Sequence, residues 1–184
     1  ALPIRNIHAI ETNLTDIELA SFPCSWAAAE HMLQRVQLEA GQSIAITGAS
    51  GGVGTALVQL AKRREAMVYA VASSQKLDQV KSVGADVVVA RETANTPAEI
   101  EALNGKKIDV VADVVGGEDF TDWLEVLRRG GKYVTAGAIA GPVVDLDLRT
   151  LYLKDLELYG ATVFDSALFE DLVGYIERGE VQPQ

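Results

Sequence analysis

The chain has 184 residues, 48% of them apolar, and a formal net charge of −10 at neutral pH. This length suits one domain with a sizeable core, and so many carboxylates argue against nucleic acid or an anionic membrane as the main partner. No apolar run could span a bilayer, the first residues lack the pattern of a secretory signal, and one cysteine excludes an internal disulfide. We therefore expect a cytoplasmic protein with a small-molecule partner.

The chain begins with an irregular segment in which Thr15 is a candidate cap for a short turn. A helix is expected from Trp26 to about Leu38, and Gly41 precedes the first strand. Strands and helices then alternate. The strands are expected at 43–47, 67–72, 86–90, 108–115, 132–136 and 156–160, and the helices at 55–64, 75–83, 96–104, 120–127 and 166–177.

This alternation predicts an α/β fold, a Rossmann-type doubly wound parallel sheet of about six strands with helices on both faces. The continuous β-branched run from Ile108 to Val115 is typical of a strand buried on both faces. Ligands of such sheets bind at the carboxyl ends of the strands. These ends are 47–50, 72–74, 90–91, 113–117 and 136–140, and only the fourth contains an acidic residue, Asp113.

The stretch from Ser43 to Arg64 combines a strand, a glycine-rich turn and a helix, the first half of a βαβ dinucleotide site. Gly51 and Gly54 stand at the second and third glycines of G-x-G-x-x-G, and Ala49 stands at the first. The start of a helix attracts a pyrophosphate through unpaired N–H groups and a partial positive charge. Gly51 leaves room for the phosphates, and Gly54 lets the helix pack on the strand. The alternative is a glycine turn that binds nothing.

The end of the second strand indicates which dinucleotide to expect. An NAD site usually has Asp or Glu there, but residues 71–76 contain no carboxylate and instead include Ser73, Ser74 and Lys76. Arg91 ends the third strand and could add a second cation. Hydroxyls and cations suit a 2′-phosphate, so we expect NADP, with NAD less favoured. Alternatively, one serine only caps the next helix and Lys76 is solvated.

Other chemistries find less support. The turn also fits T-G-x-x-x-G-x-G of short-chain dehydrogenases, but no tyrosine has a lysine four residues later, and no Gly-Lys-Ser/Thr follows to make a P-loop. Cys24 cannot form a zinc site alone, and from its residue type would be a small buried core thiol. His8 and His31 support no catalytic triad. Asp113 is either functional or only a turn residue.

Six motifs together carry a family resemblance: residues 36–41, 44–54, 59–62, 81–86, 113–117 and 129–134. They resemble the nucleotide-binding domain of the medium-chain dehydrogenase/reductase superfamily, which comprises zinc-containing alcohol dehydrogenases and NADPH quinone oxidoreductases. The resemblance covers about Leu19 to Val181. It implies reversible hydride transfer between NADPH and a carbonyl, alcohol or activated alkene in the intact enzyme, with no catalytic residue in this chain.

The resemblance also implies site residues. The cofactor-binding residues are expected to be Thr47, Ala49, Ser50, Gly51, Gly52, Val53, Gly54, Ser73, Ser74, Lys76, Arg91, Asp113, Val114, Val115, Ala136, Gly137 and Ala138. Segment 22–25 is similar to the one that supplies the third catalytic zinc ligand in zinc-dependent members. Cys24 is therefore a candidate metal ligand in the intact enzyme, where zinc is a possible second cofactor.

Residues 1–22 are expected to form a lead-in segment and residues 23–184 the NAD(P)-binding Rossmann domain, while the GroES-like catalytic domain of the family is absent from this sequence. The chain alone should bind cofactor without turning over substrate. By resemblance, Leu156–Ala161 is a candidate edge strand for a homodimer. Two alternatives are a zinc-free reductase of the same superfamily and a non-catalytic dinucleotide sensor. The sequence does not specify the substrate.

Overall fold

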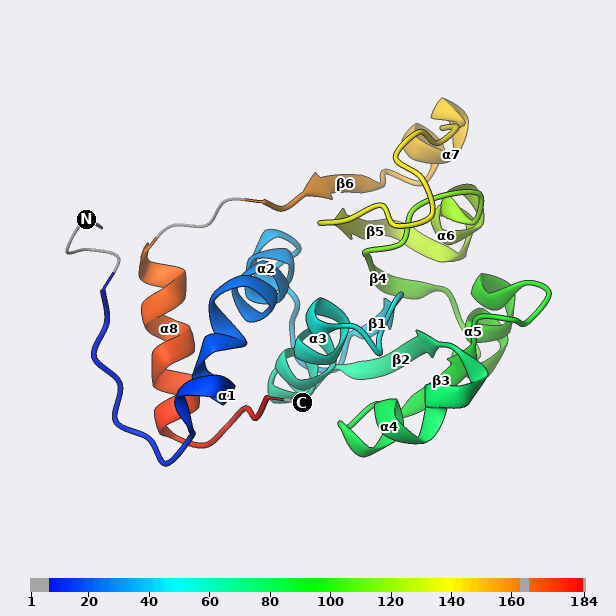
Figure 1. Ribbon diagram of the computed structural model, residues 1–184. Helices are drawn as coiled ribbons and strands as arrows, with labels where there is room; N and C mark the ends of the chain where they lie inside the picture. Colours follow the sequence, from blue (N-terminus) through cyan, green and yellow to red (C-terminus); the bar gives the residue numbers. More distant parts are fainter. Residues whose placement is uncertain (1–6, 163–165, 184) are drawn as a thin grey trace.

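The computed structural model describes residues 7–162 and 166–183, and its strands form one parallel sheet (Figure 1). The strands are β1 (Ser43–Ile46), β2 (Met67–Ala72), β3 (Val87–Ala90), β4 (Ile108–Asp113), β5 (Leu127–Thr135) and β6 (Glu157–Gly160). Their order is β3-β2-β1-β4-β5-β6, and every neighbouring pair is parallel. This confirms the doubly wound Rossmann-type sheet, in which the winding reverses between β1 and β4.

Helices cover both faces of the sheet (Figure 1). They are α1 (Asp16–Ala20), α2 (Phe22–Arg35), α3 (Gly52–Arg63), α4 (Leu77–Ser82), α5 (Thr96–Asn104), α6 (Phe120–Val126), α7 (Leu148–Leu153) and α8 (Ser166–Glu177), with a 3₁₀ turn at Ser74–Lys76. Buried residues of α2, α3 and α8 share one core cluster, and those of α5 and α6 share the other. In β1, Ile44 and Ile46 face the first cluster and Ala45 the second, because side chains alternate along a strand.

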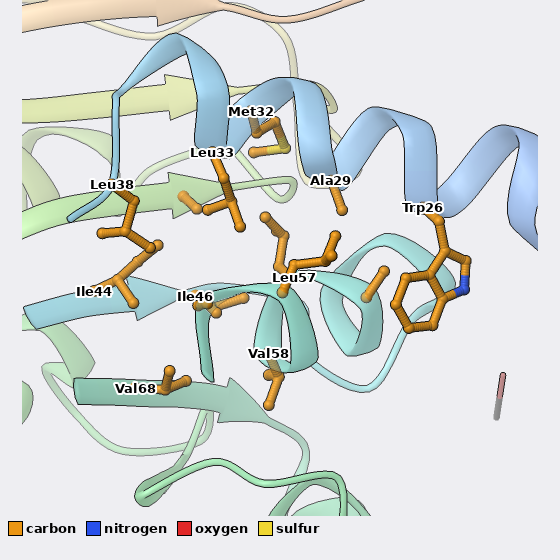
Figure 2. Close-up of a cluster of buried hydrophobic side chains, with 14 of the residues drawn as sticks. Trp26, Ala29, Met32, Leu33, Leu38, Ile44, Ile46, Leu57, Val58 and Val68 are labelled. Carbon is orange, nitrogen blue, oxygen red and sulfur yellow. The ribbon is translucent and has the colours of Figure 1, made fainter. Parts of the chain in front are cut away.

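The larger cluster lies between α2, α3 and the centre of the sheet (Figure 2). Figure 2 shows the packing of buried side chains from α2 (Trp26, Met32, Leu33), β1 (Ile44, Ile46), α3 (Leu57, Val58) and β2 (Val68). Each large aliphatic side chain buried in this way contributes about 1.5–3 kcal/mol. The cluster therefore fixes the position of the glycine-rich turn that joins β1 to α3.

Three elements begin earlier than the sequence pattern predicts, and one of them is α3, which starts at Gly52 and not at Thr55. Helix α2 starts at Phe22, since Pro23 is well suited to the first helical turn. Strand β5 starts at Leu127, and not at Lys132, because its register with β4 shifts between Ile108 and Val110. The irregular residues between Leu127 and Lys132 include two glycines, which resemble a turn in the sequence.

Two further differences concern short segments. Helix α7, at Leu148–Leu153, was not expected from the sequence; the side chain of Asp147 caps it by accepting from the N–H of Arg149 at 2.8 Å. Strand β4 ends at Asp113, two residues before the predicted end. The Asp113 carboxylate accepts hydrogen bonds from the N–H groups of Val115 and Gly116, which turns the chain away from the sheet.

Residues 7–22 of the lead-in segment pack on the rest of the chain. Thr15 caps α1 as predicted, and Glu18 completes a capping box by accepting from the N–H of Thr15 at 2.7 Å. Ile10 and Leu14 contact the larger core cluster. None of the helices in the described part of the chain combines the length and apolar character needed to cross a bilayer.

Candidate cofactor site

A cavity of about 360 Å³ opens at the carboxyl ends of the strands. Its walls come from the segments that follow β1 (Thr47, Gly48, Ser50, Gly51), β4 (Val115, Gly116) and β5 (Ile139, Ala140), from the end of β2 (Val71, Ala72, Ser73) and from Arg91 after β3. Thr96, Asp119 and Trp123 complete the lining. The cavity lies where the winding of the sheet reverses, which is the expected place for a ligand in this fold.

The glycine turn requires glycine at two positions for different reasons. Gly48 has a φ of +58°, a left-handed conformation that favours glycine. A Cβ on Gly54 would lie 2.2 Å from the carbonyl oxygen of Gly48 and 2.6 Å from the Cα of Ala49. The helix therefore packs on the turn with no room for a side chain, as the sequence predicts. A Cβ on Gly51 would meet only the Gly48 oxygen, at 3.4 Å, and Gly51 lines the cavity.

The first turn of α3 offers donors beside this cavity. Its N-cap is Gly51, and no side chain among the described residues makes a capping hydrogen bond there. The first N–H groups of a helix have no partner within the helix and carry a partial positive charge. The Thr55 hydroxyl donates to the Gly51 carbonyl at 3.0 Å and ties the turn to the helix. Free amides and an open approach at Gly51 fit a diphosphate.

A buried carboxylate, that of Asp113, holds the opposite wall of the cavity. Asp113 is 1% exposed and accepts from the hydroxyls of Thr47 and Tyr133, the Val115 N–H at 2.8 Å and the Gly116 N–H at 3.0 Å. Burial, followed by the neighbouring Asp113 charge, raises the pKa of Tyr133 far above its ordinary value, so the phenol remains a donor. Asp113 does not line the cavity itself. It positions Val115 and Gly116, and these two residues do line the cavity.

At the far end of the cavity, Ser73 and Arg91 are the predicted residues that reach the lining. Ser74 and Lys76 lie in the exposed 3₁₀ turn after β2 and are not among the lining residues. The Ser73 side chain makes no capping hydrogen bond to the turn within the described residues, so the capping alternative fails for it. Glu92, which sequence reasoning missed, accepts from the Ser74 N–H at 3.0 Å.

The remaining predicted residues surround the cavity without lining it. Ala49 and Val114 are buried beneath it, and Gly52 and Val53 lie in the first turn of α3. Ala136, Gly137 and Ala138 follow β5, immediately before the lining residues Ile139 and Ala140. Sequence reasoning did not single out Thr96 at the start of α5, Asp119 just before α6 or Trp123 within α6, since only the fold shows that they reach the cavity. Ile139 lies in the expected strand-end segment 136–140 but was not named as a site residue.

Cys24 lies exposed on the first turn of α2, so the interpretation of it as a buried core thiol is wrong. The next residue, Ser25, contacts the start of α3: a Cβ on Gly52 would lie 2.7 Å from its Oγ. Among the described residues, no three or more His, Cys, Asp or Glu side chains are grouped so that they could hold a metal ion. These residues therefore do not form a zinc site of their own.

The comparisons with known proteins agree with this geometry. Residues 52–178 match the family model described as zinc-binding dehydrogenase. A crystal structure of a putative alcohol dehydrogenase from Sinorhizobium meliloti 1021 is 50% identical with a TM-score of 0.95, and the match covers 100% of this chain and 51% of that one.

Other relatives are named for a cofactor, and the cofactors differ. The structure of an NAD-dependent alcohol dehydrogenase is 28% identical with a TM-score of 0.92, over 100% of this chain and 54% of that one, whereas two relatives are named for NADP(H). The chloroplastic NADPH-dependent alkenal/one oxidoreductase of Arabidopsis thaliana is 32% identical over 173 residues, which are 93% of this chain and 40% of the relative. The structure of the 2-octenoyl-CoA carboxylase reductase CinF in complex with NADP and 2-octenoyl-CoA is 29% identical with a TM-score of 0.87, over 94% of this chain and 44% of that one.

This chain thus spans about half the length of the relatives it matches, or less. These relatives are named as a putative alcohol dehydrogenase, an NAD-dependent alcohol dehydrogenase, an oxidoreductase and a reductase, and the region that matches the family model extends from the first turn of α3 to the end of α8. Because the family model covers more than half of the chain and the sheet has the expected order, the chain belongs to the zinc-binding dehydrogenase family of the medium-chain dehydrogenase/reductase superfamily.

Proposed function

We propose that this chain is the NADP(H)-binding domain of an oxidoreductase that transfers hydride between NADPH and a carbonyl, alcohol or activated alkene. The observation that carries the proposal is the cavity beside the uncapped first turn of α3, with Gly51 on its wall. The NADPH-dependent alkenal/one oxidoreductase and the NADP complex of CinF support the cofactor. The substrate class is taken from the family alone.

In this proposal the chain's own residues bind and orient the dinucleotide, and the nicotinamide supplies the hydride. The amides of the first turn of α3 receive the pyrophosphate. Val115 and Gly116, fixed by Asp113, form one wall of the cavity, while Ser73 and Arg91 flank the adenosine end. A non-catalytic dinucleotide sensor would use the same residues, so reduction of an enone or aldehyde by the full-length protein separates the two.

The preference for NADPH rests on Ser73 and Arg91, since both line the cavity and no carboxylate occurs in residues 71–76. We expect Arg91→Ala to weaken NADPH binding about tenfold, because a charge-assisted hydrogen bond to phosphate contributes about 1.5 kcal/mol. NADH binding should change little. Lys76→Ala should have a smaller effect, because Lys76 is exposed and outside the lining.

Calorimetric titration of the 184-residue chain with NADPH and NADH checks this prediction. Equal weakening of both dinucleotides by Arg91→Ala would contradict the NADPH preference but leave the cofactor site in place. A folded chain that binds neither dinucleotide would contradict the proposed function itself.

Cys24 bears on whether the intact enzyme uses zinc. Its exposure, and the contact of the neighbouring Ser25 with the start of α3, favour a role as one metal ligand near the cofactor. The other ligands would have to come from outside the described residues. A zinc-free reductase, in which Cys24 has no metal role, remains the alternative, and metal analysis of the full-length protein with and without Cys24→Ser decides between them.

We also propose a homodimer through β6, the edge strand at the β5 end of the sheet. Leu158 in β6 is 37% exposed, and Tyr152 and Leu153 of the preceding helix are more than 60% exposed, a patch that suits a second sheet edge. We expect Leu158→Lys to convert the dimer to a monomer, measured by light scattering after gel filtration.

Ile17→Lys is the matched control for this prediction. Ile17 is 85% exposed on α1, which lies apart from β6 (Figure 1). Ile17→Lys removes an exposed apolar side chain and adds one charge, as Leu158→Lys does, and it should leave the molar mass of the dimer in solution unchanged. If Leu158→Lys has the same mass as the unmodified chain, β6 is not the interface.

A further inference from the structure

The carboxylate of Glu92 holds two groups at the adenosine end of the cavity. Its Oε2 accepts from the backbone N–H of Ser74 at 3.0 Å, and its Oε1 accepts from the Nε of Arg91 at 3.2 Å. Sequence reasoning placed no acidic residue at the end of the second strand. That is correct for residues 71–76, but the fold brings Glu92 there from the end of β3.

The pairing of β2 with β3 explains the contact. Ala72 lies opposite Ala90, and the Arg91 N–H donates to the Ala72 carbonyl at 2.8 Å. The residues that follow each strand therefore run side by side, which brings Glu92 to Ser74. Ser73 and Arg91 in the same segments line the cavity. In a doubly wound dinucleotide site this is where the 2′ substituent of the adenosine ribose lies.

The two donors that Glu92 holds are the kinds that a 2′-phosphate needs. Phosphate oxygens bind most strongly to guanidinium groups and to backbone N–H groups. A carboxylate on the same donors both occupies them and repels a phosphate. Glu92 is ionised near neutral pH: partial desolvation opposes this, but hydrogen bonds from its own backbone, the Ser74 amide and Arg91 together lower its pKa.

We propose that Glu92 is a specificity-determining residue that limits the preference of this site for NADPH over NADH by competing with the 2′-phosphate for Ser74 and Arg91. The inference rests on the proposed dinucleotide site. NADPH must displace Glu92 from both donors, whereas NADH leaves it in place. The side chain is 48% exposed, so it can swing into solvent without breaking a packed core.

The test is a titration of the 184-residue chain with NADPH and with NADH at fixed ionic strength. We expect Glu92→Gln, which removes the charge, to tighten NADPH binding by up to about fivefold, the scale of an exposed ion pair. Glu92→Ala, which also frees the Ser74 amide, should tighten it at least as much. NADH binding should change by less than about twofold, since no 2′-phosphate is present.

Glu39→Gln is the matched control, because Glu39 is exposed and lies just before β1, at the opposite end of the strands. It makes the same change in net charge and should leave both affinities unchanged. Circular dichroism confirms that each variant is folded.

Three results would overturn the inference. If both Glu92 variants bind NADPH as the unmodified chain does, Glu92 does not compete with the 2′-phosphate, and the proposed dinucleotide site is unaffected. Weaker NADH binding with unchanged NADPH binding means that Glu92 instead holds the ribose hydroxyl. If neither the unmodified chain nor any variant binds either dinucleotide, the proposed function is wrong, and the inference, which rests on it, is wrong as well.

Discussion

A Gly54→Ala variant should lose about 3 kcal/mol of the free energy of unfolding, at the upper end of the usual cost of overpacking. The added methyl would lie 2.2 Å from the Gly48 carbonyl oxygen and 2.6 Å from the Cα of Ala49. Both are backbone atoms of a turn that is fixed between β1 and α3, so neither can move without shifting the helix. Because the shift misplaces the amides of the first turn, we expect dinucleotide binding to be lost as well.

Gly51→Ala is the informative control, because it separates packing from binding. Its Cβ would meet only the Gly48 oxygen at 3.4 Å, an ordinary contact, and its φ of −85° suits any residue. The stability should therefore change by less than about 1 kcal/mol, while dinucleotide binding weakens because the methyl enters the approach of the pyrophosphate. Urea denaturation and calorimetric titration measure the two effects, and equal destabilisation by both variants would contradict this assignment.

Removal of the Asp113 carboxylate is the second change with a large expected effect. Asp113→Ala would leave two buried hydroxyl donors and two backbone amides without their acceptor. An unsatisfied buried polar group costs about 1–3 kcal/mol, so we expect a loss of about 3 kcal/mol or more in the free energy of unfolding. The loop with Val115 and Gly116 should loosen, which weakens dinucleotide binding in whatever variant remains folded.

Tyr133→Phe tests how much of this effect belongs to the carboxylate itself. It removes one donor to Asp113 and keeps the Thr47 hydroxyl and both amides, so the expected cost is only about 1 kcal/mol. Denaturant unfolding of both variants under the same conditions provides the comparison. If Tyr133→Phe costs as much as Asp113→Ala, the hydrogen bond of the Tyr133 hydroxyl dominates, and the Thr47 hydroxyl and the two amides add little.

Much of the fold follows from the sequence because its strands are short, apolar and separated by clear helix signals. The strand Met67–Ala72 and the helix beginning at Thr96 agree with the structure residue for residue at the predicted ends. The early start of β5 could not be predicted, because residues 128–131 read as a charged turn and their pairing depends on a register shift against β4. Helix α7 has only six residues, so its apolar positions at helical spacing, Leu148, Leu151 and Tyr152, are too few to establish a helical period in the sequence.

The candidate site likewise has parts that could be predicted from the sequence and parts that could not. The glycine turn was predictable because its chemistry is local: strand, turn and helix follow one another in the chain. Asp113 could be noted at a strand end, but its role depends on Tyr133, which is twenty residues away in sequence. Glu92 depends on the register of β2 against β3, and a strand-by-strand inspection stops one residue too early to include it.

The sheet order also determines which strand edges remain unpaired while the chain is being synthesised. Strand β1 can pair with β2 once residues 67–72 have left the ribosome, but its other edge waits for β4 at residues 108–113. Until then the most buried strand of the sheet has an open, apolar edge, which is the kind of edge that invites pairing with another chain. Products of translation that stop before β4 would therefore be the aggregation-prone ones, and those that stop after it would not carry that open edge.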